Sequence, residues 1–333
     1  MGDGDDGLSA EERLIARYLR PLATHPGALG LRDDAAALTP PPGCDLVLTT
    51  DGVIAGVHFF PDDPPQTVGR KALRMNLSDL VAKGARPIGF LLSLALPRPV
   101  DEAWVAAFAA GLGEDAAAYD CPLLGGDTDH TPGPITVSIA AFGAVPRGRM
   151  VRRSTAKVGD CLAVTGTIGD AALGVKLRHD PSLSASWRLT DAMAAGLEQR
   201  YLLPQPRTAL AEAVLQNATA AMDISDGLVG DLGKLCNASA LAAEIDVARV
   251  PLSAAAETAV AAAPALIETV LTGGDDYEVL LTLAPARLDA VRAAARRIGV
   301  TVTEIGRMRA GAGARFMRAG AALEFAQRSY SHF

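Results

Sequence analysis

Aspartates that stand beside glycine, serine or threonine at the ends of apolar stretches are the side chains here with the clearest chemical potential. In LLGGDTDH, residues 123–130, an apolar run leads into two glycines and a carboxylate. One such motif is usually a turn or a helix cap, but several together favour a shared site. Carboxylates suit Mg²⁺, which fills its remaining positions with water and substrate phosphates. The motifs contain Asp33, Asp34, Asp51, Asp79, Asp127, Asp129, Asp223, Asp226, Asp275 and Asp276.

Other catalytic motifs are absent or incomplete. Gly233-Lys234 precedes a leucine, which rules out the usual phosphate-binding loop, and no G-x-S-x-G is present. The segment GTIGDAALG, residues 166–174, indicates a glycine turn into a helix. Arg152 and Arg153 are either a solvated basic pair or partners for phosphate charge. His58 stands alone among apolar residues, a pattern that is more typical of a packing histidine than of a ligand.

The first half of the chain predicts alternating helices and strands that would position these aspartates. Helices are predicted at 9–19, where Ser9 and Glu12 form a capping box, at 67–84 and at 101–119. Strands are predicted at 45–51, 90–97 and 134–145. Within 67–84, three leucines form an apolar stripe, while Asn76, Asp79 and Lys83 share a polar face. This face would bring Asp79 toward a neighbouring element.

The second half begins after a basic, polar stretch at 146–160, where we place a domain boundary. A strand at 161–166 and helices at 171–177, 186–200 and 206–219 are predicted. After them come a loop entering a helix at 223–236, a glycine turn before a strand within 270–283, and a helix followed by a strand within 286–308. This mixture predicts α/β plus α+β domains, 1–148 and 149–333. Gly-Gly-Asp and Thr/Ser-Asp-Gly occur in both halves and hint at a duplication.

Bulk composition limits the partners. With 333 residues and a net charge of −7, the chain is expected to bind no nucleic acid. The sequence contains no run of 18 uncharged apolar residues, so no membrane span is predicted. The acidic start lacks the pattern of a secretory signal. The four cysteines have no zinc or disulfide spacing, which indicates a reducing, cytoplasmic setting.

Seven motifs in register resemble the thiamine-monophosphate kinase family: TTDGVIAGVHF, NLSDLVAKGARP, LLGGDT, RRSTAKVGD, DISDGL, LTGGDDYEVL and the final YSHF. That family belongs to a superfamily with aminoimidazole ribonucleotide synthetase, selenophosphate synthetase and a hydrogenase maturation factor. The resemblance implies a two-domain aminoimidazole ribonucleotide synthetase-like fold, whose N-terminal sheet domain pairs in a homodimer. It also implies direct in-line transfer of the γ-phosphoryl group of ATP to thiamine monophosphate, with several Mg²⁺ ions and no phospho-enzyme.

The resemblance assigns roles to individual positions. Expected substrate contacts are His58 and Asp275. Expected ATP contacts are Gly126, Asp127, Arg153 and Ser225. No general base is expected, since the acceptor phosphate is already largely ionised near pH 7. The expected magnesium ligands are Asp34, Thr49, Thr50, Asp51, Asp79, Asp127, Asp223 and Asp226.

Three positions depart from the family pattern. Arg32 lies in the glycine-rich segment before Asp34, Asp275 replaces a usual glutamate, and Gln327 stands where an aromatic often stacks on the substrate ring, with Tyr330 as a substitute. Two alternative functions stay open: a related ATP-dependent synthetase with another acceptor, and a non-catalytic nucleotide- or metal-binding protein. Cys44 lacks the glycine-rich setting of the reactive cysteine in a selenophosphate synthetase.

Overall fold

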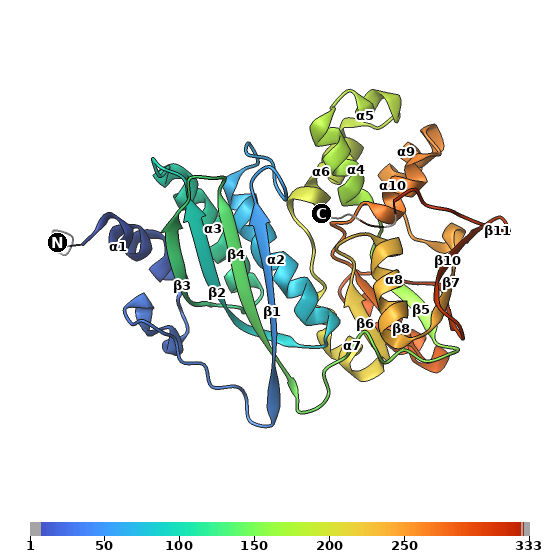
Figure 1. The fold of residues 1–333 in the computed structure, drawn as a ribbon, viewed down its shortest axis with the longest axis horizontal. Helices are drawn as coiled ribbons and strands as arrows, with labels where there is room; N and C mark the ends of the chain where they lie inside the picture. Colours follow the sequence, from blue (N-terminus) through green and yellow to red (C-terminus); the bar gives the residue numbers. More distant parts are fainter. Residues whose placement is uncertain (1–7, 328, 330–333) are drawn as a thin grey trace. The chain divides into compact units, whose positions relative to one another are not determined.

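The structure, a computed structural model, describes residues 8–327 and residue 329. Backbone contacts divide the described chain into two compact units. The first contains the residues up to Leu80 together with Arg86–Gly148, and the second contains Val81–Ala85 and the described residues from Arg149 onward. Figure 1 shows that each unit has its own sheet and its own helices.

The sheet of the first unit has four strands in the order β1-β4-β2-β3. They are β1 (Cys44–Ile54), β2 (Arg86–Leu96), β3 (Leu123–His130) and β4 (Thr136–Pro146). Strand β4 is antiparallel to both β1 and β2, whereas β2 and β3 are parallel. The three predicted strands are therefore present, and the LLGGDTDH segment forms a fourth strand along its whole length.

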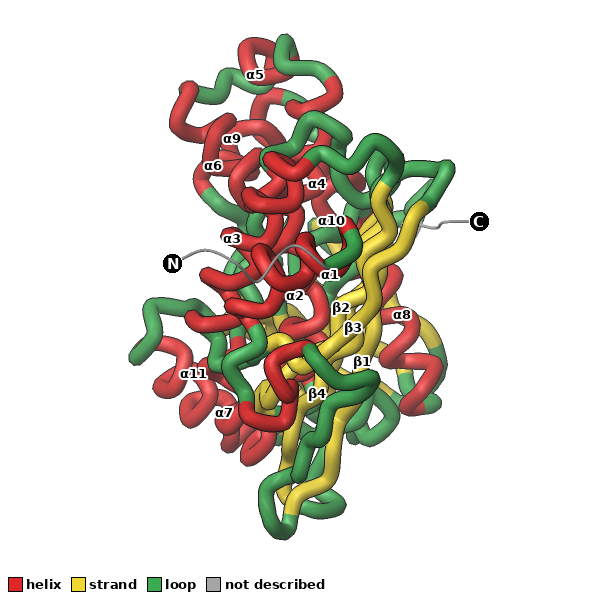
Figure 2. The backbone as a smooth tube through the Cα atoms, turned by 90° about the vertical axis from the view of Figure 1, so that its left-hand side faces the viewer, coloured by secondary structure: helices red, strands yellow, loops and turns green. Residues whose placement is uncertain are grey.

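Alternating burial explains why this sheet is covered on one face. Along β2, Phe90, Leu92 and Leu94 are at most 2% exposed, while Ser93 between them is exposed. Side chains two residues apart along a strand share a face, so one side of the sheet is apolar and covered. Figure 2 shows α2 (Pro65–Ala82) and α3 (Glu102–Ala118) on the same side of these strands.

Glycines allow α2 and α3 to pack closely. A Cβ at Gly69 would lie 2.5 Å from the carbonyl oxygen of Phe108, and one at Gly111 would lie 2.1 Å from that of Gln66. The predicted leucine stripe of α2, Leu73, Leu77 and Leu80, is fully buried. Before the sheet, α1 (Ala10–Leu14) begins at the predicted capping box and continues as a π-helical turn, η1 (Ile15–Leu19). Short 3₁₀ turns follow at η2 (Arg20–Leu22) and η3 (Pro26–Leu31).

The second unit contains a seven-stranded sheet in the order β11-β10-β7-β9-β5-β8-β6. Its strands are β5 (Cys161–Thr165), β6 (Ala220–Asp223), β7 (Ala242–Asp246), β8 (Val279–Leu283), β9 (Val302–Arg309), β10 (Gly313–Arg318) and β11 (Ala321–Ala322). All neighbouring pairs are antiparallel except β10 and β7. The sequence pattern does not predict β6, β7, β10 or β11.

Helices cover both faces of the strands at the centre of this sheet. Leu162 and Val164 of β5 belong to one hydrophobic cluster, and Cys161 and Ala163 belong to another. A strand that is buried on both faces has a continuous apolar sequence rather than an alternating one, as CLAVT does. The first cluster includes residues of α4 (Asp170–His179), α6 (Asp191–Leu202), α8 (Leu228–Ser239), α9 (Ala254–Ala262) and α10 (Leu266–Thr272).

The second cluster joins α7 (Ala211–Asn217) and α11 (Leu288–Arg296) to the other face. Helix α11 and strand β9 match the predicted helix and strand within 286–308. The helix predicted at 186–200 occurs as α5 (Leu183–Ser186) followed by α6, and the one predicted at 206–219 as the turns η4 (Thr208–Leu210) and α7. Two further turns are η5 (Val247–Arg249) and η6 (Pro285–Arg287). Among the described helices, none is long and apolar enough to cross a membrane.

Candidate functional site

A cavity of about 720 Å³ in the first unit brings two of the predicted aspartate segments together. Asp33 and Asp34 line it from the segment after η3, and Gly126, Asp127 and Thr128 line it from β3. Asp34 thus lies beside Gly126 and Asp127 around one cavity, although it is far from them in the sequence. A cavity of this size with a few convergent polar groups is typical of a small-molecule site.

Gly126 is required by the close approach of two strands. A Cβ at this position would lie 1.8 Å from the carbonyl oxygen of Leu92 in β2, and the φ of Gly126 is 153°. No other residue fits without moving β2 or β3. The next residue, Asp127, pairs in register with Ser93 and is exposed. The close packing of the strands therefore fixes the backbone that carries the Asp127 carboxylate.

The segment that carries Asp34 has an unusual backbone. Leu29, Gly30 and Leu31 have φ values of 51°, 64° and 52°, in a region that L-residues rarely adopt. The guanidinium of Arg20 donates a hydrogen bond of 3.0 Å to the carbonyl oxygen of Gly30 and so holds this turn. Arg32, the departure from the family pattern, is exposed. Such strain is found where the surrounding structure imposes a functional conformation.

A second polar group lies where β1 meets α2. The Thr49 hydroxyl donates a 2.5 Å hydrogen bond to Asp79, and the N–H of Asp51 donates one of 3.2 Å to Asn76. The predicted polar face of α2 is therefore correct for Asn76 and Asp79, which face β1. The hydroxyl of Thr50, the neighbour of Thr49 in the strand, donates to the carbonyl oxygen of Ile139 in β4 at 3.0 Å. Adjacent strand residues point to opposite faces, which separates the Thr50 side chain from this group.

His58 lies in the loop that follows β1. Its Nδ1 accepts a 3.1 Å hydrogen bond from the N–H of Ile54, which places the ring proton of a neutral imidazole on Nε2. The ammonium group of Lys71 donates to the carbonyl oxygen of His58 at 3.1 Å. The half-buried ring thus stabilises the turn that returns the chain toward α2. These contacts agree with the packing interpretation of His58 and leave its expected substrate contact as a prediction.

In the second unit, two loops lie side by side and bring four predicted residues together. The N–H of Asp275 donates to the carbonyl oxygen of Ser225, and that of Tyr277 donates to Ile224, each at 2.8 Å. The N–H of Ile224 donates in return to the carbonyl oxygen of Glu278 at 2.9 Å. The loop with Asp223, Ser225 and Asp226 therefore runs beside the loop with Asp275. The structure places the expected ATP contact and the expected acceptor contact on adjacent backbone.

A buried aspartate that the sequence analysis did not select orders the first of these loops. One Asp231 oxygen accepts the N–H groups of Ser225 and Asp226, both at 2.9 Å. Its other oxygen accepts a 2.7 Å hydrogen bond from Lys234, which also pairs with Asp226. Burial raises the pKa of Asp231, although Lys234 opposes the rise. The ammonium group of Lys234 thus lies between the carboxylates of Asp226 and Asp231.

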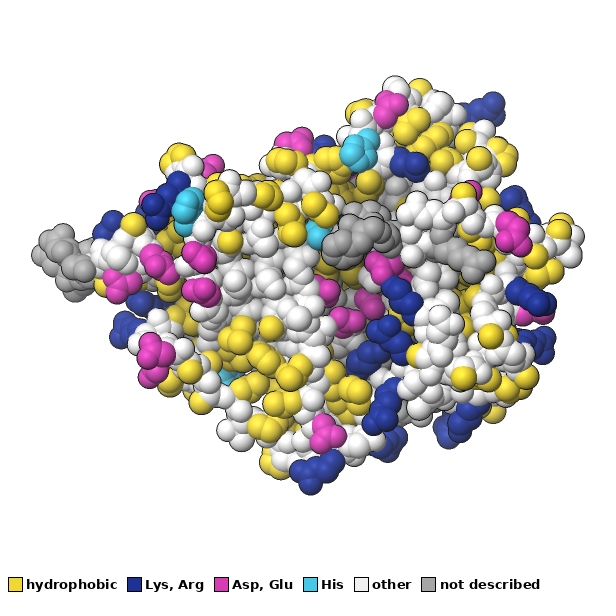
Figure 3. Space-filling view, in the orientation of Figure 1, with side chains coloured by type: hydrophobic (Ala, Val, Ile, Leu, Met, Phe, Trp, Pro, Cys, Tyr) yellow, Lys and Arg dark blue, Asp and Glu magenta, His cyan; other side chains and the backbone are white. Residues whose placement is uncertain are grey.

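Arg153 belongs to a segment that pairs with β6. The N–H of Ala221 donates to the carbonyl oxygen of Arg152 at 3.3 Å, and the Ser239 hydroxyl donates to that of Arg153 at 2.8 Å. The Arg153 side chain is exposed. The backbone of Arg152, the residue before Arg153, is therefore held opposite Ala221, two residues before Asp223 in β6. Figure 3 shows several Lys and Arg side chains gathered in a band on one face of the molecule, where they would favour an anionic ligand.

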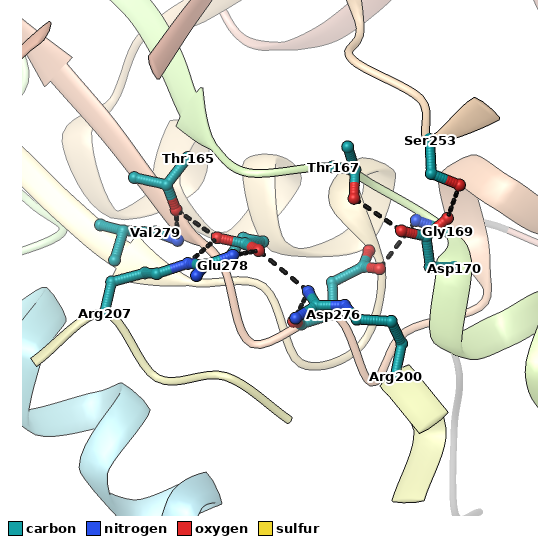
Figure 4. A network of polar contacts seen from close by, with 10 residues as sticks. All are labelled: Thr165, Thr167, Gly169, Asp170, Arg200, Arg207, Ser253, Asp276, Glu278 and Val279. Atoms are coloured by element: carbon teal, nitrogen blue, oxygen red, sulfur yellow. Dashed lines mark hydrogen bonds and ion pairs between the residues drawn. The ribbon is translucent and has the colours of Figure 1, made fainter. Parts of the chain in front are cut away.

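A buried polar network beside these loops was not predicted from the sequence. Figure 4 shows Glu278, which is fully buried, accepting hydrogen bonds from Arg200 at 2.9 Å, from Arg207 at 2.7 Å and from the Thr165 hydroxyl at 2.6 Å. The only sequence signal for it was the cluster of acidic residues after Gly274. Glu278 directly follows the loop of Asp275, so the network fixes the end of that loop.

Within the described residues, no group of three or more His, Cys, Asp or Glu side chains is arranged to hold a metal ion. The donors that are present, carboxylate and hydroxyl oxygens, are nevertheless those that Mg²⁺ prefers. Gln327 is exposed and donates to the carbonyl oxygen of Ser329 at 3.1 Å. Tyr330 and the YSHF motif lie outside the described residues.

Comparison with known proteins gives matches along most of the chain. The family model of the AIR synthase related protein, N-terminal domain, matches residues 32–145, and that of its C-terminal domain matches residues 157–318. The thiamine-monophosphate kinase of Caulobacter vibrioides is 44% identical over 304 residues, which are 90% of this chain and 84% of the relative.

Solved structures agree with these matches. The crystal structure of thiamine-monophosphate kinase from Stenotrophomonas maltophilia superposes with a TM-score of 0.81 at 37% identity and covers 94% of this chain and 98% of its own. AaThiL complexed with AMPPCP and TMP has a TM-score of 0.77 at 32% identity and covers 90% of this chain and 91% of its own. The first of these structures confirms the two-domain fold over nearly the whole length.

Proposed function

The chain belongs to the thiamine-monophosphate kinase family, and on that premise we propose that it transfers the γ-phosphoryl group of ATP directly to thiamine monophosphate. The products are ADP and thiamine diphosphate. The observation that best supports this proposal is the pairing of the 223–226 loop with the 275–277 loop, because it sets an expected ATP contact beside an expected acceptor contact. The ATP analogue AMPPCP and TMP bound to AaThiL support the same pair of substrates.

Phosphoryl transfer between two phosphates depends on position and charge neutralisation more than on covalent help. We propose that Gly126, Asp127, Arg153 and Ser225 bind ATP. The exposed guanidinium of Arg153 offsets phosphate charge. The acceptor phosphate is largely ionised at pH 7, so no side chain has to remove a proton from it.

We propose that magnesium would be held by carboxylate and hydroxyl side chains. When bound, Mg²⁺ cancels the repulsion between the donor and acceptor phosphates and fixes their approach. The chain itself presents Asp34 and Asp127 around one cavity and orders Asp226 through Asp231. The full proposed ligand set is Asp34, Thr49, Thr50, Asp51, Asp79, Asp127, Asp223 and Asp226.

Substrate recognition is proposed for His58 and Asp275. The Asp275 side chain is one methylene shorter than the usual glutamate. Its backbone is left-handed, with φ of 62°, and its carboxylate accepts a 3.3 Å hydrogen bond from the Tyr277 hydroxyl. We propose that this rigid loop presents the shorter side chain to the acceptor.

We further propose that the first unit pairs with a second copy through the face of its sheet that the helices leave open. Leu46 and Leu48, which alternate with the buried residues of β1, are 40% and 64% exposed. Figure 3 shows hydrophobic side chains gathered over this sheet. Exposed apolar patches of this kind mark association surfaces. A cytoplasmic location also stays a proposal, and the four free cysteines support it.

The kinase proposal is tested with purified protein, Mg²⁺, ATP and thiamine monophosphate, with chromatographic detection of thiamine diphosphate. Asp127→Asn should abolish turnover while the protein stays folded. Asp129→Asn is a matched control on the same strand, since Asp129 is exposed and, in the described part of the chain, its carboxylate accepts a hydrogen bond from the N–H of His130. Turnover of an aminoimidazole precursor instead would establish the related synthetase. ATP binding without any turnover would establish a non-catalytic protein.

A further inference from the structure

One buried carboxyl beside the proposed acceptor contact has no role in the function described so far. Asp276 is 1% exposed and lies in the loop between α10 and β8. Its Oδ1 accepts a 2.7 Å hydrogen bond from the N–H of Gly169, the residue that precedes α4. Its Oδ2 is buried and has no hydrogen-bond partner among the described residues. Figure 4 shows the side chain pointing away from the loop toward Gly169.

The backbone on both sides of Asp276 is strained. Asp275 and Tyr277 have φ values of 62° and 50°, and Gly274 before them has 79°. L-residues other than glycine rarely adopt this region, and they persist in it only where the surroundings impose it. Two backbone hydrogen bonds, from Asp275 to Ser225 and from Tyr277 to Ile224, hold one side of the loop. The Asp276 side chain holds the other side, through Gly169.

The surroundings of Asp276 favour a protonated carboxyl. Burial raises the pKa of Asp276 well above the usual range, and the carboxylates of Asp170 and Glu278 raise it further. The Gly169 N–H and the guanidinium of Arg200 oppose this rise without cancelling it. Asp170 accepts hydrogen bonds from two hydroxyls and Glu278 pairs with two guanidiniums, so neither supplies a proton acceptor for Oδ2 in the described structure.

We propose that Asp276 is a positioning residue: its side chain fastens the loop to the start of α4 and thereby sets the angle at which Asp275 meets the acceptor substrate. The role needs a hydrogen-bond acceptor of this length, not a negative charge. An asparagine supplies the same acceptor. A leucine of similar size does not, and it leaves the Gly169 N–H buried without a partner. The proposal rests on the proposed contact between Asp275 and thiamine monophosphate.

The test compares Asp276→Asn, Asp276→Leu and, as the control, Asp275→Asn in the full chain. Two quantities are measured: KM for each substrate, and hydrogen exchange of the peptides that cover residues 169–177 and 273–279. Asp276→Asn should stay within threefold of the wild type in KM for both substrates, and its loop should exchange no faster than that of the wild type. Asp276→Leu should raise KM for thiamine monophosphate at least tenfold, leave KM for ATP within threefold, and speed exchange of the loop at least tenfold.

Asp275→Asn should raise KM for thiamine monophosphate without faster exchange, because it removes the contact but keeps the anchor. Equal changes in both KM values for Asp276→Leu, or unchanged exchange, would overturn the proposal. So would an asparagine variant that behaves like the leucine variant. If Asp276→Leu does not fold, Asp276→Ala replaces it with the same expectations. A wild type without kinase activity would refute the proposed function, while the exchange data would still decide whether Asp276 anchors the loop.

Discussion

Glu278→Gln should strongly destabilise the second unit. Glu278 is fully buried and accepts hydrogen bonds from Arg200 and Arg207, whose side chains are only 15% and 14% exposed. The substitution keeps the shape of the side chain but removes the negative charge that Glu278 supplies to two largely buried guanidiniums. Removal of one member of a buried ion pair costs about 3–5 kcal/mol. For a unit of this size, the melting temperature should fall by about 6–20 °C.

Urea unfolding followed by tryptophan fluorescence measures this loss. The chain has two tryptophans, and Trp187 is 4% exposed in the core of the second unit. A Trp104→Phe background therefore leaves a single reporter of that unit. Glu244→Gln is the matched control, because Glu244 and Arg309 are 53% and 56% exposed and their atoms lie 3.7 Å apart. Such a surface pair contributes at most about 1 kcal/mol. The reasoning is refuted if Glu278→Gln costs no more than the control.

Three further substitutions test other parts of the structure. Gly126→Ala would place a Cβ 1.8 Å from a carbonyl oxygen of β2 and should weaken ATP binding, measured by calorimetry, at least tenfold. The control Gly133→Ala, whose added Cβ would have its nearest atom at 3.5 Å, should leave ATP binding unchanged. Because the pKa of Asp276 is raised, the folded chain keeps a proton that the unfolded chain loses above about pH 4. The free energy of unfolding of the wild type should therefore fall as the pH rises toward the folded pKa, by up to about 1.4 kcal/mol per pH unit. Asp276→Asn lacks this loss. In urea titrations from pH 5 to pH 8, the free energy of unfolding of the variant should therefore rise relative to that of the wild type. A difference between the two that stays constant with pH would contradict the assignment. Lys234→Met removes a cation from two carboxylates and should strengthen Mg²⁺ binding about fivefold in calorimetry, because repulsion between Lys234 and the metal ion would weaken binding by about 1 kcal/mol. The control Lys176→Met should leave Mg²⁺ binding unchanged. Equal effects of the two variants would count against the metal role of Asp226.

Elements with a clear local pattern could be predicted from the sequence. The stripe and polar face of α2 follow from the helical period, and the structure confirms that Asn76 and Asp79 face β1. The capping box at Ser9 and Glu12 is also present. In each case the residues that decide the structure lie within one or two turns of each other, so a short window of sequence contains the whole signal.

Features that depend on distant partners could not be predicted. Gly125, Gly126 and Asp127 lie within a strand, whereas the similar Gly273, Gly274 and Asp275 lie in a loop after a helix. The similarity of the two motifs therefore does not extend to their local structure. The motif at 125–127 forms a strand because it pairs with β2. A short window of sequence around the motif does not contain β2 and so cannot show this pairing. The partners of Glu278 are likewise supplied from β5, α6 and the loop before α7.

The position of β5 in the second sheet has a consequence for synthesis on the ribosome. This strand, Cys161–Thr165, pairs with β8 and β9, which end at Leu283 and Arg309. An emerging polypeptide must therefore carry an unpaired, largely apolar strand until most of its length has been translated. We expect the nascent chain to depend on chaperones during that interval, and a premature stop codon before β9 to yield an insoluble product.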